Sequence, residues 1–159
     1  MSSDKHTLNE LARTYNKRLV ASLKGEGTLT SPVVEDAFMS ILRHAFIDYY
    51  YAHNPAGTEA EQWRRIERPS GEDVASWLEG IYANAPLVTA FDESGMPCSS
   101  SSMPGIMAFM LEALQLRPGM RLLEIGTGTG YNAALLAHIV GDPQLVFSVE
   151  LDSSLAYSA

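Results

Sequence analysis

The chain has 159 residues, of which 46% are hydrophobic and 19% charged, and its formal net charge is −8. This composition is ordinary for a globular protein with one domain-sized core. The acidic balance offers no positive field to neutralise phosphates, so nucleic acid is not expected as a partner. One cysteine, Cys98, excludes an internal disulfide. Since no apolar run approaches the roughly 20 residues that span a membrane, we expect a cytoplasmic protein without membrane contact.

Residues 1–84 are expected to form a helical N-terminal region. Apolar residues recur at helical spacing over 7–24 and Gly25 ends the pattern, which predicts an amphipathic helix. A second helix is expected from Ser31, because this capping serine precedes Pro32 and an apolar face follows. The two helices would pair across a short glycine loop.

The next stretch has no clear period. Tyr49 to Tyr51, followed by Asn-Pro-Ala-Gly, predict an exit from the second helix into a turn. A charged stretch then surrounds Trp63, which we expect to be a partly buried packing residue. Ser70 is expected to cap a third helix, whose apolar face runs from Val74 to Ile81.

The second region, residues 85–159, opens with strand and turn signals. Leu87 to Phe91 is predicted to be a strand, the Asp-Glu-Ser-Gly run after it a turn, and Met96 to Ser102 a returning segment. Ser102 and Pro104 stand immediately before an apolar stretch, as a capping serine and an N-terminal proline should. They therefore predict the start of another helix.

The strongest pattern lies near the C-terminal end of the sequence. A short apolar strand, Leu122 to Ile125, runs into Gly-Thr-Gly-Thr-Gly at 126–130, and an apolar helix follows. The glycines let backbone amides approach a ligand closely, and the helix N-terminus adds positive potential. A second strand, Leu145 to Val149, ends on Glu150. This acid follows Gly126 by 24 positions, close to the spacing of about 20 at which an acid meets a ribose hydroxyl.

Two kinds of cofactor fit such a unit. A dinucleotide needs the wider Gly-x-Gly-x-x-Gly spacing to seat its pyrophosphate, whereas here the third glycine comes one place early. An acid, Glu124, also lies inside the first strand. These features favour S-adenosylmethionine, which has no phosphate and carries a cationic amino acid end and a sulfonium. A nicotinamide oxidoreductase is the weaker alternative, because these residues contain no credible proton relay.

Met110 to Gly141, MLEALQLRPGMRLLEIGTGTGYNAALLAHIVG, resembles the first cofactor-binding motif of the protein-L-isoaspartate O-methyltransferase family. Ser-Val-Glu-Leu-Asp at 148–152 resembles the second motif. Residues 42–47 are similar to the family's Pro-Arg-His-x-Phe-Val stretch, in which we expect His44 to tie a helix to a loop. Relative to the family, residues 52–70 look like an insertion.

The resemblance implies a Rossmann-like α/β methyltransferase fold with N-terminal helices, which binds S-adenosyl-L-methionine. By its spacing from Pro104, Ser102 matches the serine of the family's Thr-Ile-Ser-Gln-Pro motif and is the expected catalytic residue; no metal is expected. The substrate-binding residues implied by the same motif are Ser100, Ser101, Met103 and Pro104. The expected cofactor-binding residues are Glu124, Gly126, Thr127, Gly128, Thr129, Gly130 and Glu150.

The substrate implied by the resemblance is an L-isoaspartyl residue of a damaged protein or peptide, and the implied role is protein repair. A branch of the family that methylates aspartate in ribosomally made precursor peptides shares this motif, so peptide modification stays open as an alternative. Such a fold needs about six or seven strands, and only two parallel strands are visible. We therefore expect the front part of a larger enzyme, truncated after the second parallel strand; a noncatalytic binding fragment is the third possibility.

Overall fold

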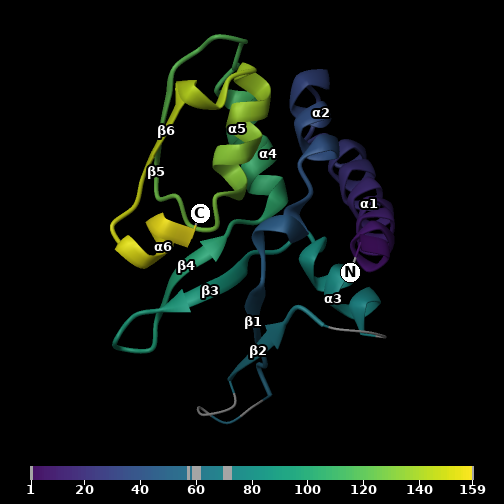
Figure 1. The fold of residues 1–159 in the computed structure, drawn as a ribbon, viewed down its shortest axis with the longest axis vertical. Coiled ribbons are helices and arrows are strands. Elements are labelled where there is room, and N and C mark those ends of the chain that lie inside the picture. Colours follow the sequence, from purple (N-terminus) through teal and green to yellow (C-terminus); the bar gives the residue numbers. More distant parts are fainter. Residues whose placement is uncertain (1, 57, 59–61, 70–72, 159) are drawn as a thin grey trace.

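The computed structural model describes residues 2–56, 58, 62–69 and 73–158 (Figure 1). No helix in these ranges is long and apolar enough to cross a membrane. A helical pair, a four-stranded sheet and a parallel strand pair beside a helix make up the fold. In chain order the elements are α1 (Ser2–Gly25), α2 (Pro32–Ser40), the 3-10 helix η1 (Arg43–Phe46), β1 (Tyr49–His53), β2 (Trp63–Glu67), α3 (Val74–Ile81), β3 (Leu87–Phe91), β4 (Pro97–Ser101), α4 (Pro104–Ala113), β5 (Leu122–Ile125), α5 (Tyr131–Val140), the 3-10 helix η2 (Pro143–Leu145), β6 (Val146–Val149) and α6 (Ser153–Ser158).

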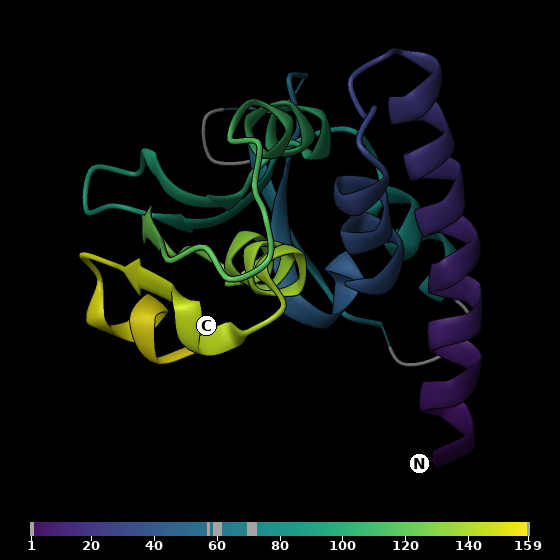
Figure 2. The same cartoon turned by 90° about the horizontal axis from the view of Figure 1, so that it is seen from above.

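The two N-terminal helices pack against each other as predicted, and α2 lies between α1 and α5 (Figure 2). The apolar stripe of α1 is buried at Ala12 and Leu23, and Phe38 of α2 belongs to the same hydrophobic core. Asn16 on α1 also donates a hydrogen bond of 2.8 Å to the Phe38 carbonyl oxygen. Burial of these stripes supplies most of the stability of amphipathic helices.

The four-stranded sheet is antiparallel and has the strand order β2-β1-β3-β4. One face of the sheet packs on α3, where Tyr50 is buried. A Cβ added to Gly80 of α3 would lie 2.1 Å from the Tyr50 hydroxyl oxygen, so only glycine leaves room for this ring. The sheet therefore joins β1 and β2 to β3 and β4 in one layer.

This sheet corrects the sequence analysis in one respect. Residues 49–53 and 63–67 form a β-hairpin, not a turn and a charged loop, so the description of 1–84 as helical is wrong for these strands. The pairing of Tyr51 with Val88 also carries the sheet across the predicted boundary between residues 84 and 85. That boundary stays a prediction. Trp63 is half-buried, as expected.

The parallel pair β5 and β6 confirms the predicted strand, glycine loop, helix and strand. Leu122 and Val146 pack on the core, on the side where α5 covers the pair. The other side is apolar and open: Leu123 is 66% exposed and Ile125 83% exposed.

The start of α4 differs from the expectation. Pro104 is the first helical residue, as predicted, but Met103 is the N-cap and no side chain caps the helix. The expectation that Ser102 caps this helix is therefore wrong. The third predicted helix is confirmed as α3, whereas its expected cap, Ser70, lies outside the described residues.

Candidate active site

The glycine loop between β5 and α5 turns in the left-handed region of backbone conformation. The φ angles of Gly126, Gly128 and Gly130 are +87°, +54° and +79°, and residues with a Cβ rarely adopt such angles. A Cβ on Gly128 would also lie 3.3 Å from the Ser100 carbonyl oxygen. The loop therefore needs glycine here both for its conformation and for its approach to β4.

Glu150, directly after β6, holds this loop. Its carboxylate accepts the Gly128 N–H at 3.0 Å through one oxygen and the Leu151 N–H at 2.8 Å through the other. The hydrogen bond from Gly128 is the main reason that the pKa of Glu150 lies below its usual value. Glu150 thus ties the end of β6 to the loop that follows β5.

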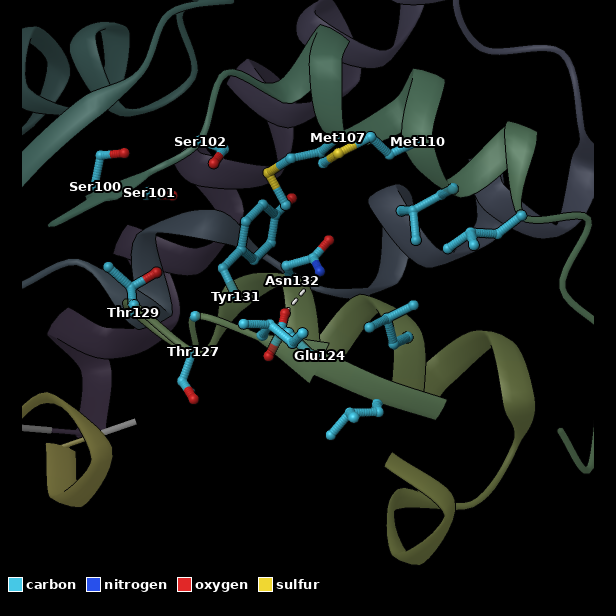
Figure 3. A pocket seen from close by; sticks show the side chains of 17 residues that line it. Ser100, Ser101, Ser102, Met107, Met110, Glu124, Thr127, Thr129, Tyr131 and Asn132 are labelled. Carbon is cyan, nitrogen blue, oxygen red and sulfur yellow. Dashed lines mark hydrogen bonds between the residues drawn. The ribbon is translucent and has the colours of Figure 1, made fainter. Parts of the chain in front are cut away.

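Glu124 has a different setting although it lies in the adjacent strand. It is only 8% exposed, and it accepts hydrogen bonds from the Asn132 side chain at 2.7 Å and from the Ser148 hydroxyl. The Ser148 hydroxyl also bonds to Thr127 at 2.7 Å. This small network joins β5, β6 and the start of α5 beneath the glycine loop, and Figure 3 shows the bond between Glu124 and Asn132.

A cavity of about 310 Å³ separates the glycine loop from the turn between β4 and α4. In Figure 3 Ser100 and Ser101 at the end of β4 and Ser102 directly after it lie on one side, Glu124 and Thr127 on the other, and the Tyr131 ring between them. Eight predicted site residues line the cavity: Ser100, Ser101, Ser102, Glu124, Gly126, Thr127, Gly128 and Thr129. Four others do not line it: Met103, Pro104, Gly130 and Glu150.

Each of these four residues has a visible role beside the cavity. Met103 and Pro104 begin α4, and Pro104 is buried. Gly130 is the N-cap of α5, and Glu150 holds Gly128 as described. Nine further lining residues were not predicted, because the sequence pattern assigns them only to apolar faces, to a strand or to a helix start: Met107, Met110, Leu111, Leu114, Leu123, Ile125, Tyr131, Asn132 and Leu136.

Ser102 itself is exposed, and its hydroxyl makes no hydrogen bond to another described residue. Ser101 differs, since it is buried and its hydroxyl accepts from the Arg43 Nε at 3.2 Å. All three serines line the cavity, but the hydroxyl of Ser101 is engaged by Arg43, whereas the hydroxyl of Ser102 is not engaged.

Arg43 holds the end of β4 and the turn after it in place, a role that was not predicted although residues 42–47 resemble a stretch of the family. Its guanidinium is completely buried and donates to the carbonyl oxygens of Ser101 at 3.0 Å and Ser102 at 2.9 Å. It also donates to the Ile81 and Ala85 carbonyls, at 2.9 and 3.1 Å. Burial lowers the pKa of Arg43 from 12.5 to about 10, so the group stays charged at neutral pH. All its partners here are neutral.

His44 has the structural role predicted for it. One ring nitrogen bonds to the Tyr82 hydroxyl at 2.8 Å and the other to the Asn9 side chain at 3.0 Å, which ties η1 to α1 and to the end of α3. Burial, with a smaller contribution from Arg68, lowers the pKa of His44 from 6.5 to about 4. The ring is therefore neutral near pH 7.

A parallel strand, a glycine loop, a helix and a second strand ending in an acid define a Rossmann-like cofactor-binding unit, and the α/β fold with N-terminal helices is of the methyltransferase class. A family model described as "Protein-L-isoaspartate(D-aspartate) O-methyltransferase (PCMT)" matches residues 72–159, more than half of the chain. The chain belongs to this family.

Two relatives illustrate the similarity. The protein-L-isoaspartate O-methyltransferase of Pyrococcus horikoshii is 34% identical over 135 residues, which are 84% of this chain and 46% of that protein. The enzyme of the same name from Thermotoga maritima is 48% identical over 85 residues, which are 54% of this chain and 27% of that protein. The chain thus spans between about a quarter and a half of these relatives.

Two solved structures are similar over nearly the whole chain. One, named protein-L-isoaspartate O-methyltransferase, has a TM-score of 0.62 and 30% identity, and the match covers 91% of this chain and 36% of that one. The other is a putative enzyme of the same kind from Plasmodium falciparum, in complex with S-adenosyl-L-homocysteine. Its TM-score is 0.62 at 19% identity, over 90% of this chain and 52% of that one, and it supports the fold.

Proposed function

We propose that this chain supplies the cofactor cradle and the acceptor side of an S-adenosylmethionine-dependent carboxyl O-methyltransferase that acts on L-isoaspartyl residues of proteins or peptides. The observation that carries the proposal is that Ser100, Ser102 and the glycine loop line one and the same cavity. A donor held by the loop and an acceptor held by the serines would meet there. Family membership supports the same substrate.

The residues present fit the cofactor. The backbone of Gly126 to Gly130 can approach its methionine part closely, because no Cβ stands in the way at the glycines. Glu124 lines the cavity floor, and Glu150 lies at the end of β6, where an acid can accept from a ribose hydroxyl. When bound, S-adenosylmethionine supplies a methyl group on a sulfonium; its demethylated product is the ligand in the Plasmodium falciparum structure.

The acceptor needs little activation, because a carboxyl group with a reference pKa near 4 is already ionised at neutral pH. Most of the acceleration then comes from holding the acceptor oxygen about 3 to 3.5 Å from the methyl carbon and from excluding water. We assign the free hydroxyl of Ser102 to donate a hydrogen bond to this carboxylate. Ser100 lines the same wall, and Met103 and Pro104 fix the wall to α4.

The first test is a calorimetric titration of S-adenosylmethionine into the 159-residue chain, with NAD as the control ligand. We expect micromolar binding, about 8 kcal/mol, for the sulfonium cofactor only. A folded chain that binds neither ligand, or that prefers NAD, would contradict the proposal.

The second test concerns the acceptor. Labelled isoaspartyl peptides should bind the chain more tightly than matched aspartyl peptides, and Ser102→Ala should weaken isoaspartyl binding without changing the melting temperature. Ser40→Ala, at an exposed serine of α2, is the matched control and should change neither quantity. Tighter binding of the aspartyl peptides would move the assignment to the branch that modifies precursor peptides.

A further inference from the structure

One face of the four-stranded sheet carries a continuous row of aromatic side chains that the site described above does not include. The Tyr51 ring lies 4.8 Å from the Phe91 ring, and Phe91 lies 5.3 Å from Trp63. Tyr49 extends the row at one end, 5.9 Å from Tyr51, and His53 extends it at the other, 4.8 Å from Trp63. Most of these pairs meet edge to face, which is a favourable arrangement for aromatic rings.

This aromatic row is not part of the hydrophobic core. Tyr50, which alternates with Tyr49 and Tyr51 along β1, points to the opposite face and is buried there against α3. Tyr51, Trp63 and Phe91 are half-exposed. Because the rings fix one another, they form a preorganised apolar surface that a ligand can use at a low cost in entropy.

The register of the sheet connects this row to the candidate active site. Tyr51 is paired with Val88, and Val88 is paired with Ser100, which lines the cavity. Residues directly opposite each other on neighbouring antiparallel strands present their side chains on the same face. Tyr51 and Ser100 therefore share a face and are separated by two strand spacings, roughly 9.5 Å.

We propose that the aromatic row binds the segment of the polypeptide substrate that flanks the acceptor residue. This inference rests on the proposed function, because only a methyltransferase with a polypeptide acceptor places such a segment beside Ser100. An extended chain rises about 3.3 Å per residue, so a segment that crosses β4, β3 and β1 places the residue about three positions from the acceptor over Tyr51. The row selects a large apolar or aromatic side chain at that position.

The charges at the row agree with apolar recognition. Arg65 lies 3.9 Å above the centre of the Tyr49 ring, and its guanidinium pairs with Glu67 at 2.9 Å. The positive charge at this end of the row is thus matched by a negative one on the same strand. The selectivity of the surface therefore comes from ring packing and not from the net charge of the peptide.

The test measures the binding of labelled peptides to the 159-residue chain by fluorescence anisotropy. Three peptides share one isoaspartate and an otherwise alanine and serine sequence: one has Phe three positions before the acceptor, one has Phe three positions after it, and one has Ala at both places. We expect one of the Phe peptides to bind about tenfold more tightly than the Ala peptide. Tyr51→Ala and Phe91→Ala should remove that preference.

Tyr157→Ala is the matched control, because Tyr157 is 97% exposed and lies on α6, outside the row. It should leave the preference intact, and Tyr51→Phe, which keeps the ring, should retain most of it. Melting curves of each variant show that the fold is kept. Equal affinity for all three peptides, or a preference that survives in Tyr51→Ala, would overturn the inference.

The failure of this inference can be distinguished from a failure of the proposed function. If the chain binds S-adenosylmethionine but shows no preference among the peptides, only the role of the aromatic row is refuted. If the preference depends on Tyr51 but the cofactor does not bind, peptide binding by the row is supported and the methyltransferase assignment is refuted. Analytical ultracentrifugation tests whether a second copy of the chain binds the row instead. A dimer that dissociates in Tyr51→Ala would make the row a contact between copies and overturn the inference.

Discussion

The two walls of the candidate active site are built in different ways. The glycine-loop wall comes from one segment, residues 122–150, and its main contacts stay within that segment: Gly128 with Glu150, 22 positions apart, and Glu124 with Asn132, 8 positions apart. The serine wall, Ser100 to Ser102, depends on Arg43, which lies 58 residues away from Ser101 in the sequence. The contacts of the first wall lie within one segment of 29 residues, whereas those of the second wall join segments that are far apart in the sequence.

This difference predicts whether a substitution in each wall changes mainly ligand binding or mainly the free energy of unfolding. Loss of a contact in the glycine-loop wall should change ligand binding more than stability, because β5, β6 and their loops are largely exposed. Loss of the Arg43 side chain should lower the free energy of unfolding more than it changes ligand binding, because it removes buried hydrogen bonds that link η1, α3 and β4. The following four experiments test this division.

The largest effect is expected for Arg43→Met. The substitution leaves the carbonyl groups of Ile81, Ala85, Ser101 and Ser102 without their buried donor, which should cost about 3 to 5 kcal/mol of unfolding free energy. Urea denaturation measures this. The matched control is Arg121→Met, at an exposed arginine directly before β5, where we expect a change below about 0.5 kcal/mol. Similar losses in the two variants would refute the division.

The second experiment follows stability against pH through His44. The folded ring has a pKa of about 4, whereas the unfolded ring takes up a proton below about 6.5. Stability should therefore be complete above pH 6.5 and fall as the pH decreases toward 4, by about 2 to 3 kcal/mol. His44→Asn, which cannot titrate, should be less stable at pH 7 but should lose less between pH 7 and 5. Parallel pH profiles for the two proteins would contradict the assignment.

The third experiment compares two glycines with a similar backbone. Gly128→Ala and Gly141→Ala both force a side chain into the left-handed region, at φ of +54° and +82°, and each should cost about 1 to 2 kcal/mol of stability. Only Gly128 faces the other wall, through the Ser100 carbonyl oxygen at 3.3 Å; nothing lies within 4 Å of a Cβ at Gly141. S-adenosylmethionine affinity, measured by calorimetry, should therefore fall in Gly128→Ala and stay unchanged in Gly141→Ala.

The same division explains what could be predicted from the sequence. Leu122 to Gly130 show their strand, loop and helix start within a few residues, so the cofactor side was recognisable before the structure. Arg43 could not be assigned a role, because all but one of its hydrogen-bond partners are backbone carbonyls spread from Ile81 to Ser102, and carbonyls leave no pattern in a sequence. The β1 strand was missed for a related reason: consecutive tyrosines do not alternate in polarity, although their side chains alternate between the two faces of the sheet.

The smallest change in stability is expected for Glu150, and this experiment separates its two possible roles. The carboxylate holds the Gly128 and Leu151 amides in the structure, whereas the proposed function also has it accept from a ribose hydroxyl. Glu150→Gln keeps one acceptor oxygen for an amide or a hydroxyl but loses the charge, and Glu150→Ala loses both.

If holding the loop is the main role, Glu150→Ala should weaken the binding of S-adenosylmethionine and of free methionine by similar factors, about tenfold. If the ribose contact dominates, S-adenosylmethionine binding alone should fall, because methionine has no ribose, and Glu150→Gln should recover part of it. An unchanged affinity in Glu150→Ala would exclude both roles and leave the glycine backbone as the whole of the cofactor wall.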